Sequence, residues 1–476
     1  MKLLAPLLLP LLLAVEPAAA FPIKAFHLDL RIQVMTLPAL ERLVQQLHDG
    51  GVNTLIMEYE GTYPFEHHAP IPNRYAYTKE EITQFVAYCD RLDVAVIPLQ
   101  QSFGHVEYIL RHDRYKGLRE DDKDLSQICP SKPAEDSLLF TDLYAQLAKT
   151  HPGPYIHIGC DETHLLGHCA LCRKRVAEEG ISALYFNYVR MLCNIVIRLG
   201  KRPVLWADMA LKYPEAIRTL PKGTIFVDWN YGWNMNNFGE HRKLVESGYE
   251  IWGAPSIRSN PDNFYLTDWK KHFHNISDFV SKSRELGYAG IVLTSWSTSG
   301  AYSYLYESEN ELLDLQAIRH VYPLTGFHIL LAAYFQSLRD TLDVDRFIAG
   351  YCADRFGFSP VDAATFRQAL FDTTSLAMKT LHPSKNQTEF KHFCLMADIR
   401  RQYQQFEAIQ REANSENADP QRLVPRLKAL LDADSTLSRA FIELNQDDYY
   451  PSELTKENAL RTEKIRILYD QLSKSR

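Results

Sequence analysis

The sequence lacks a surplus of basic residues. Its 476 residues include 52 Lys and Arg against 59 Asp and Glu, which gives a formal net charge of −7. Proteins that bind nucleic acids usually carry a basic surplus or stripe, so this balance argues against that class. Hydrophobic residues make up 46% of the chain and charged residues 23%, which excludes a disordered or collagen-like protein. We also find no repeat period and no low-complexity tract.

Long apolar runs are scarce, and the most extended one lies within residues 1–20. This segment has a basic residue near its start, an apolar stretch over residues 3–15 and three alanines at 18–20, a pattern typical of a secretory signal peptide cleaved after Ala20. A membrane anchor needs about 20 apolar residues, and Glu16 ends this run earlier. We therefore expect a protein without a membrane span that is secreted or lumenal, in a periplasm, a lysosome or the extracellular medium.

Eight cysteines are present, and two of them form a C-x-x-C pair, Cys169 and Cys172. An even number of cysteines in an exported protein permits disulfides without requiring them. The pair is interpreted as a local disulfide or as two thiols. A zinc site is the alternative, because His164 and His168 lie close in sequence and could complete the ligand set.

Short apolar runs alternate with amphipathic helical stretches through the first two thirds of the chain. This alternation predicts parallel strands joined by helices, and eight such units predict a (β/α)₈ barrel over residues 21–335. A doubly wound sheet is the alternative, but it usually has a glycine-rich turn after the first strand, and residues 30–33 contain no glycine. Beyond residue 335 the strand pattern fades, and we expect an α-helical domain over 336–476. The expected strands are residues 25–30, 53–59, 94–99, 155–159, 202–206, 224–229, 250–254 and 290–296.

Reactive and aromatic side chains recur where these strands end. In a barrel of this kind the ligand site lies at the C-terminal ends of the strands. The fourth strand leads into Asp161 and Glu162, which taken alone could equally be a solvated turn or a helix cap. Three indoles at other strand ends, Trp206, Trp229 and Trp296, favour an aromatic cup around a small rigid ligand such as a sugar.

The segment HIGCDETH, residues 157–164, resembles the H-x-G-x-D-E signature of the family 20 glycoside hydrolases, the exo-β-N-acetylhexosaminidases. The similarity is greatest to the hexosaminidase D branch. Supporting strings such as HLDLR (27–31), VIPLQQSFGHVEYIL (96–110) and IVLTSW (291–296) extend it over about residues 25–300. The resemblance implies a (β/α)₈ barrel that hydrolyses glycans with a terminal N-acetylhexosamine.

The resemblance further implies substrate-assisted catalysis, in which the 2-acetamido oxygen of the sugar attacks the anomeric carbon and forms an oxazolinium ion. Asp161 would orient the acetamido N–H, Glu162 would serve as general acid and base, and Tyr231 would donate a hydrogen bond to the acetamido oxygen. For these roles we expect Asp161 to remain ionised and Glu162 to have a raised pKa. No cofactor and no metal are expected for this reaction.

The same resemblance implies a set of substrate-binding residues. His105 is expected to support the acid and base, and the indoles are expected to shape the acetamido pocket. The full expected set is Asp29, Glu60, His105, Trp206, Asp208, Trp229 and Trp296.

Two departures from the family pattern leave the choice between galacto and gluco sugars open. Lys24 stands where family members commonly have an arginine that grips O3 and O4 of the sugar, and a lysine lacks the bidentate fork. In addition, the string Trp296-Ser297-Thr298 lacks the glutamate often found after the eighth strand.

Other functions and assemblies stay open at this point. A catalytically inactive glycan-binding barrel is one alternative. A conventional retaining glycosidase with Glu58 or Glu60 as nucleophile is another. The helical tail could cover the barrel or pair with a second copy in a homodimer.

Overall fold

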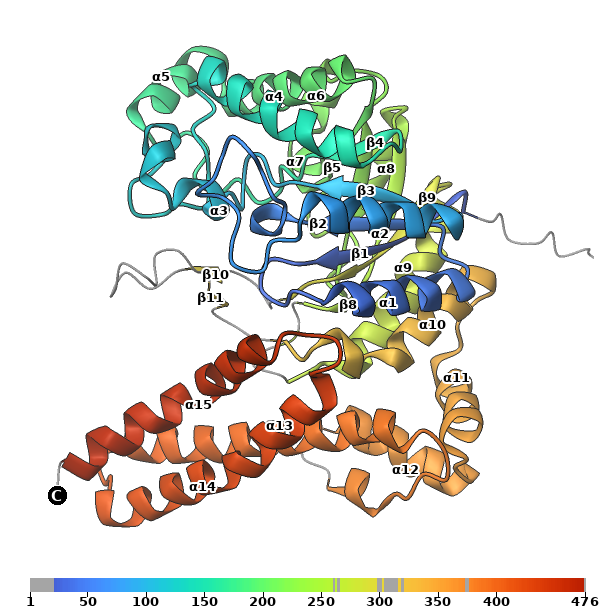
Figure 1. The fold of residues 1–476 in the computed structure, drawn as a ribbon, viewed down its shortest axis with the longest axis vertical. Coiled ribbons are helices and arrows are strands. Elements are labelled where there is room, and N and C mark those ends of the chain that lie inside the picture. The colour runs from blue at the N-terminus through green and yellow to red at the C-terminus, as the bar shows by residue number, and fades with distance from the viewer. Residues whose placement is uncertain are drawn as a thin grey trace, which may run out of the picture.

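The computed structural model describes residues 21–259, 262, 266–297, 302–303, 316–317, 321–372 and 376–474. At its centre, eight parallel strands close into a barrel, as the sequence predicts (Figure 1). Closure is direct, because the first and last strands of the ring pair in parallel from Ile23 opposite Gly290 to Leu28 opposite Ser295. The ring consists of β1 (Ile23–Asp29), β2 (Thr54–Glu58), β3 (Ala95–Leu99), β4 (Tyr155–His157), β5 (Arg202–Trp206), β6 (Ile225–Trp229), β7 (Glu250–Ala254) and β9 (Gly290–Ser295).

All eight expected strands are confirmed. A further short strand, β8 (Ser256–Arg258), pairs with the outer part of β9 and was not among those expected. Two two-residue strands, β10 (Tyr302–Ser303) and β11 (Gln316–Ala317), pair with each other in antiparallel fashion.

Alternate side chains of the ring strands point inward and fill the barrel. They form a compact apolar cluster that includes Ala25, Ile97, Val204, Val227 and Val292. This packing matches the period of two along a strand and the layered interior of such barrels. The barrel interior is therefore a solid core, and a ligand site of the barrel has to lie beyond the ends of its strands.

Helices surround the ring and bury their apolar faces against its outer side (Figure 1). A capping box starts α2, where Thr78 accepts a hydrogen bond from the Glu81 backbone and Glu81 accepts one from the Thr78 backbone. The helices of this region are α1 (Leu37–Asp49), α2 (Lys79–Arg91), α3 (Glu107–Leu110), α4 (Pro133–Thr150), α5 (Ala170–Glu179), α6 (Ile181–Arg198), α7 (Asp208–Lys212), α8 (His241–Glu246), α9 (Trp269–Glu285) and α10 (His328–Arg339).

The helix α10 crosses the boundary predicted between residues 335 and 336. The hydroxyl of Tyr334 in this helix donates hydrogen bonds to the main-chain oxygens of Ala25 at 2.8 Å and Ile291 at 3.2 Å. Because these oxygens belong to β1 and β9, α10 packs directly over the seam where the barrel closes.

The remaining chain forms the expected helical tail, in which α13, α14 and α15 lie side by side (Figure 1). The tail contacts the barrel region where Met35 and Tyr449 form an antiparallel bridge and where Arg42 pairs with Asp448. Its helices are α11 (Val344–Tyr351), α12 (Pro360–Phe371), α13 (Gln387–Ala413), α14 (Pro420–Asn445) and α15 (Pro451–Lys474).

Residues 1–20 lie outside the described residues, so the expected signal peptide stays a prediction. Within the described ranges, no single helix is both long enough and apolar enough to cross a bilayer. The helices α5 and α6 reach that length and apolar content together, but they meet at an angle of 107°.

Candidate active site

A cavity of about 330 Å³ lies over the C-terminal ends of the ring strands. Seven of the residues predicted from the sequence to form the site line it: Asp161, Glu162, His105, Tyr231, Trp206, Trp229 and Trp296. Most of them lie at or directly after the C-terminal ends of β4, β5, β6 and β9, which is why residues far apart in the sequence meet here.

Aromatic rings form one wall of the cavity. The rings of Trp206 and Trp296 lie 5.7 Å apart, and the Tyr231 ring lies 5.0 Å from Trp229 and 5.4 Å from Trp233. These separations are typical of packed aromatic pairs, so each ring restrains the next. The result is a rigid apolar wall of the kind that holds the face of a sugar ring.

The two acids follow β4 on a backbone of unusual conformation. Gly159, Cys160 and Glu162 have φ angles of 68°, 75° and 47°, and two of these residues are not glycine. Such conformations cost energy and persist only where the surrounding structure enforces them. Here the hydroxyl of Tyr185 donates a hydrogen bond to the Cys160 carbonyl at 2.8 Å.

Further contacts fix this turn. The backbone N–H of Glu162 donates to Asp208 Oδ2 at 3.0 Å. A Cβ added at Gly104 would overlap the main-chain oxygen of Asp161, so the loop after β3 passes in direct contact with the loop after β4. The acids are therefore positioned by two interlocked loops and not by β4 alone.

His105, in the loop after β3, binds both acids. Its Nε2 lies 3.1 Å from Glu162 Oε2 and 3.6 Å from Asp161 Oδ2. Burial opposes a charged imidazole, but the carboxylates of Asp161 and Glu162 raise the pKa of His105 to about 10. The imidazole is therefore an imidazolium at neutral pH and pairs with Glu162.

The pKa values of the two acids run opposite to expectation in the free protein. Burial raises the pKa of Asp161 to about 6, although His105 acts against this. Burial would also raise the pKa of Glu162, but the hydrogen bond and charge of His105 hold it below its usual range. The reason is that His105 forms its hydrogen bond with Glu162, whereas it lies 3.6 Å from Asp161. This difference depends on the folded structure and could not be predicted from the sequence.

Several polar atoms of the site are available to a ligand. Within the described part of the chain, Asp161 Oδ1 and Trp206 Nε1 are buried without a hydrogen-bond partner. Trp296 Nε1 donates to the Tyr231 oxygen at 2.9 Å, and Thr294 also forms a side-chain hydrogen bond with this hydroxyl. One unpartnered acceptor and one unpartnered donor thus border the same cavity beside the Tyr231 hydroxyl.

Asp29, predicted to bind substrate, does not line the cavity but is fully buried beneath it. It accepts hydrogen bonds from Arg31 Nε at 2.9 Å and from the Ser297 hydroxyl at 2.7 Å. Despite its burial, the charge of Arg31 holds the pKa of Asp29 well below its usual range. Asp29 therefore positions Arg31, whose guanidinium lines the cavity 5.2 Å from the Trp296 ring.

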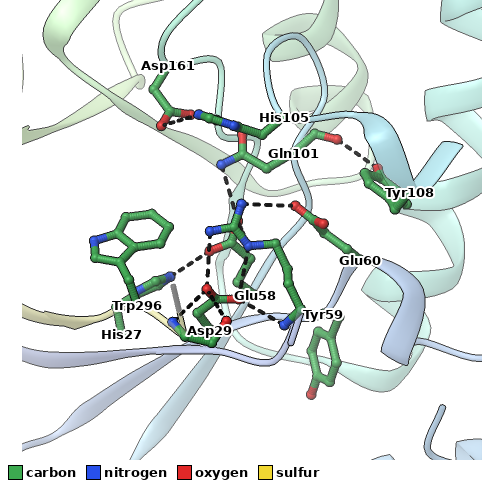
Figure 2. Close-up of polar contacts among 12 residues, drawn as sticks. His27, Asp29, Glu58, Tyr59, Glu60, Gln101, His105, Tyr108, Asp161 and Trp296 are labelled. Atoms are coloured by element: carbon green, nitrogen blue, oxygen red, sulfur yellow. Dashed lines mark hydrogen bonds and ion pairs between the residues drawn. The ribbon is translucent and has the colours of Figure 1, made fainter. Parts of the chain in front are cut away.

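Glu58 and Glu60 are also buried and do not line the cavity. Glu58 accepts hydrogen bonds from His27 Nε2 at 2.9 Å and from Gln101 Nε2 at 3.2 Å. Glu60 lies 4.0 Å from Arg31, and burial raises its pKa well above the usual value. Figure 2 shows both acids in the network around Asp29, below His105 and Asp161.

Asp208 is a third predicted substrate ligand that does not line the cavity. Its carboxylate holds the Glu162 backbone, and burial raises its pKa to about 7. Asp29, Glu60 and Asp208 thus lie outside the lining of this cavity and contact residues that face it, and their expected roles as substrate ligands stay predictions.

Sequence reasoning missed five residues of the cavity wall. Lys24, considered there as the sugar-gripping cation, does not line the cavity, and Arg31 supplies the cation instead. Trp233 could have been found from its position two residues after Tyr231, whereas the others carry no signal in the sequence. The missed residues are Arg31, Trp233, Asn237, Phe238 and Ser259. Thr298 lies outside the described residues.

His105, Asp161 and Glu162 place their ligand atoms within 4.8 Å of one another, as three metal ligands would. The same three groups also form a hydrogen-bonded acid and base cluster, in which His105 Nε2 contacts both carboxylates.

Comparison with known proteins gives concordant matches. Residues 30–315 match Glycosyl hydrolase family 20, catalytic domain. Hexosaminidase D of Bos taurus is 28% identical over 300 residues, covering 59% of this chain and 86% of the bovine protein. Hexosaminidase D of Homo sapiens is 28% identical over 308 residues, covering 60% of this chain and 62% of the human protein.

Among solved structures, the GH20 β-N-acetylhexosaminidase from Streptomyces coelicolor A3(2) aligns with a TM-score of 0.51. The alignment covers 74% of this chain and 69% of that chain at 14% sequence identity. At this identity the likeness supports the fold.

Proposed function

The chain belongs to glycosyl hydrolase family 20, and we propose that it is a retaining exo-β-N-acetylhexosaminidase that uses the acetamido group of its substrate as the nucleophile. Its substrates are terminal β-linked N-acetylgalactosamine or N-acetylglucosamine. The observation that carries the proposal is the free Asp161 Oδ1 beside Glu162, in a cavity of about 330 Å³ walled by tryptophans.

Asp161 acts on the acetamido group. Its unpartnered oxygen accepts the acetamido N–H, which turns the carbonyl oxygen of that group toward the anomeric carbon. As the carbonyl oxygen forms its bond to this carbon, positive charge spreads over the new ring, and the ionised Asp161 stabilises it. The Tyr231 hydroxyl donates to the same carbonyl oxygen and holds it in line for attack.

Glu162 handles the proton. It donates a proton to the glycosidic oxygen as the bond from that oxygen to the anomeric carbon breaks. Water then attacks the anomeric carbon, Glu162 takes a proton from the water, and the oxazolinium ring opens with net retention of configuration.

In the free protein the proton needed by Glu162 resides on His105, 3.1 Å away. A sugar in the cavity excludes water from Glu162, whose side chain is 39% exposed in the free protein. Desolvation disfavours two charges more than a neutral pair, so it drives the proton from His105 to Glu162. Substrate binding thereby protonates Glu162, which can then act as the general acid.

A conventional carboxylate nucleophile is disfavoured by geometry. Its two candidates, Glu58 and Glu60, are 0% and 1% exposed and do not line the cavity. The acids that line the cavity are Asp161 and Glu162. In the proposed mechanism Asp161 binds the acetamido group and Glu162 transfers the proton, so neither acts as the nucleophile.

The test compares aryl β-glycosides that carry either an acetamido or a hydroxyl group at C2, in both galacto and gluco series. We expect turnover of the acetamido substrates and essentially none of the hydroxyl substrates, together with strong inhibition by a thiazoline mimic of the oxazolinium ion. Equal turnover of both series would establish a carboxylate nucleophile. Binding of N-acetylhexosamine without turnover of any substrate would establish an inactive glycan-binding barrel.

We also propose that residues 1–20 direct export, as their composition suggests. Mass spectrometry of the protein expressed in its natural host should give a chain that begins at Phe21. A chain that retains residues 1–20 in the cytosol would contradict this.

A further inference from the structure

A second cluster of reactive side chains lies outside the catalytic cavity. Cys129 Sγ is 3.5 Å from both Cys169 Sγ and Cys172 Sγ, and Cys172 Sγ is 3.2 Å from Glu120 Oε2. All four ligand atoms lie within 4.8 Å of one another. Cys129, Cys172 and Glu120 are buried, and Cys169 is half-buried.

Two backbone hydrogen bonds that do not involve the sulfur atoms help to hold the cluster in place. Glu120 Oε1 accepts the Cys169 backbone N–H at 2.7 Å, and the Cys129 N–H donates to the Leu118 carbonyl at 2.8 Å. Cys169 is the N-cap of α5, and Cys172 lies in the first turn of that helix. The four side chains therefore converge because the chain around them is ordered.

The spacing of the sulfur atoms suits a metal better than a disulfide. A disulfide requires sulfur atoms about 2.05 Å apart. It would join only two of the three cysteines, and the third thiol and the carboxylate would have no part in it. Tetrahedral zinc with bonds of about 2.3 Å to sulfur separates its thiolates by about 3.8 Å. Three thiols and a carboxylate oxygen at such separations form a complete tetrahedral set.

We propose that Cys129, Cys169, Cys172 and Glu120 bind one zinc ion in a closed structural site. Sulfur ligands in a tetrahedral arrangement favour Zn²⁺ among the divalent cations, and four protein ligands leave no position open for catalysis. The ion also offsets half of the negative charge that three thiolates and a carboxylate would otherwise concentrate in one buried place.

The ligand set differs from the one that the C-x-x-C spacing suggested. His168 Nε2 pairs with Asp121 at 2.9 Å, and His164 is 80% exposed with its Nε2 nearest to Glu162. Neither histidine belongs to the cluster. Their places are taken by Cys129 and Glu120, which lie about 40 and 50 residues earlier in the chain.

The site connects the two loops on which the active site depends. Glu120 and Cys129 belong to the segment between β3 and α4, which carries His105, while Cys169 and Cys172 close the segment after β4, which carries Asp161 and Glu162. A zinc ion bound to both segments restrains them relative to each other. We therefore expect the metal to stabilise the chain and the catalytic geometry without entering the reaction.

The experiment measures zinc in the full-length protein purified under reducing conditions with added Zn²⁺. Elemental analysis should find one zinc ion per chain, and replacement by Co²⁺ should give the intense visible bands and sulfur-to-cobalt charge transfer of a tetrahedral thiolate site. In Cys169→Ser we expect the zinc content to fall to background and the thermal midpoint to drop. Serine is a good N-cap, so this variant keeps the start of α5 intact.

Two controls separate this site from the rest of the molecule. Cys394→Ser removes another half-buried thiol and should retain the zinc. Glu162→Gln should also retain the zinc, which shows that the ion is not bound by the group of His105, Asp161 and Glu162. Because this variant is expected to lose hydrolase activity and keep zinc, the zinc proposal and the proposed function can fail independently of each other. If Cys169→Ser does not fold, removal of zinc from the wild-type protein by a chelator, followed by Co²⁺ titration, gives the same answer.

Three results would overturn the proposal. The first is wild-type protein that takes up neither Zn²⁺ nor Co²⁺ under reducing conditions. The second is a disulfide between any two of Cys129, Cys169 and Cys172 in the protein isolated from its host, found by peptide mapping after alkylation. The third is unchanged zinc content in Cys169→Ser.

Discussion

His105, Asp161 and Glu162 share their protons, and this sharing fixes the expected pH dependence. The pKa of Asp161 is raised to about 6, and the proposed mechanism requires its ionised form to stabilise the oxazolinium ion. Activity should therefore be present above this pKa and be lost as the pH falls through about 6. The measurement is kcat/KM against pH, whose acidic limb reports the free enzyme.

Asp161→Asn provides the control for that assignment. The variant should have low activity at all pH values and should lose the acidic limb near pH 6. An acidic limb that persists unchanged in the variant would assign the titration to another group.

Glu162→Gln should lower kcat by about two to four orders of magnitude, the usual contribution of a general acid and base. The amide preserves the shape of the side chain but has no proton to donate to the leaving oxygen. Glu66→Gln, at an exposed position outside the cavity, is the matched control and should keep full activity. Activity of Glu162→Gln near that of the wild type would refute the assigned role.

At the scale of residues, the sequence predicted those site residues that lie at the ends of the ring strands. Asp161, Glu162, Tyr231 and the three tryptophans line one cavity because each directly ends or follows a ring strand. The sequence could not predict which of the side chains at the strand ends do not face the cavity, and Asp208 is an example. This residue also follows a strand, but its carboxylate accepts a hydrogen bond from the Glu162 backbone N–H.

Arg31 was missed for a related reason. Its guanidinium is positioned at the cavity by contacts with side chains from other parts of the barrel, including Glu60 at 4.0 Å and the Trp296 ring, as well as by Asp29 at 2.9 Å. The reversed pKa values of Asp161 and Glu162 likewise depend on which of them His105 contacts. Both facts are properties of contacts in space and leave no pattern along the chain.

At the scale of elements, the catalytic geometry depends on the close passage of the loops after β3 and β4. Gly104→Ala would drive a methyl group into the Asp161 carbonyl and separate the loops. Since small misplacements of catalytic groups are costly, we expect kcat/KM to fall by about a hundredfold. Steady-state kinetics with an acetamido substrate measures the effect.

Gly117→Ala is the control from the same connection. No atom lies within 4 Å of a Cβ added there, so activity and melting temperature should change little. Equal losses in the two variants would show that the connection tolerates no substitution, and would remove the special role of Gly104.

The elements themselves were predictable where their patterns are long. The ring strands and α14 follow from apolar runs and helical periodicity that tertiary contacts reinforce. The three-residue β8 carries no such pattern, because its pairing depends on the end of β9. The partnership of Cys169 and Cys172 with Cys129 likewise requires the loops to be folded.

At the scale of the whole molecule, a buried polar path joins the barrel to the helical tail. Arg258 is fully buried and donates to Ser295 in β9, to Gln33 and to the Tyr322 carbonyl, while the Tyr322 hydroxyl contacts His392 in α13. We expect the barrel and the tail to unfold in a single transition, as followed by calorimetry.

Arg258→Met tests this coupling. It leaves the acceptors on Gln33 and Tyr322 unsatisfied, so the free energy of unfolding should fall by about 2 kcal/mol or more. The loss should appear together in signals from both parts of the molecule. Two separate transitions in the wild-type protein would contradict a shared core.

The filled barrel interior beneath the cavity has a kinetic consequence for the proposed hydrolase. A pocket with a solid floor has one mouth, and the remainder of the glycan occupies that mouth while the terminal sugar sits inside. After the bond is cut, the truncated glycan must depart before the freed monosaccharide can leave. The monosaccharide should thus inhibit competitively as the last product released, and each visit to a chain end should remove a single sugar.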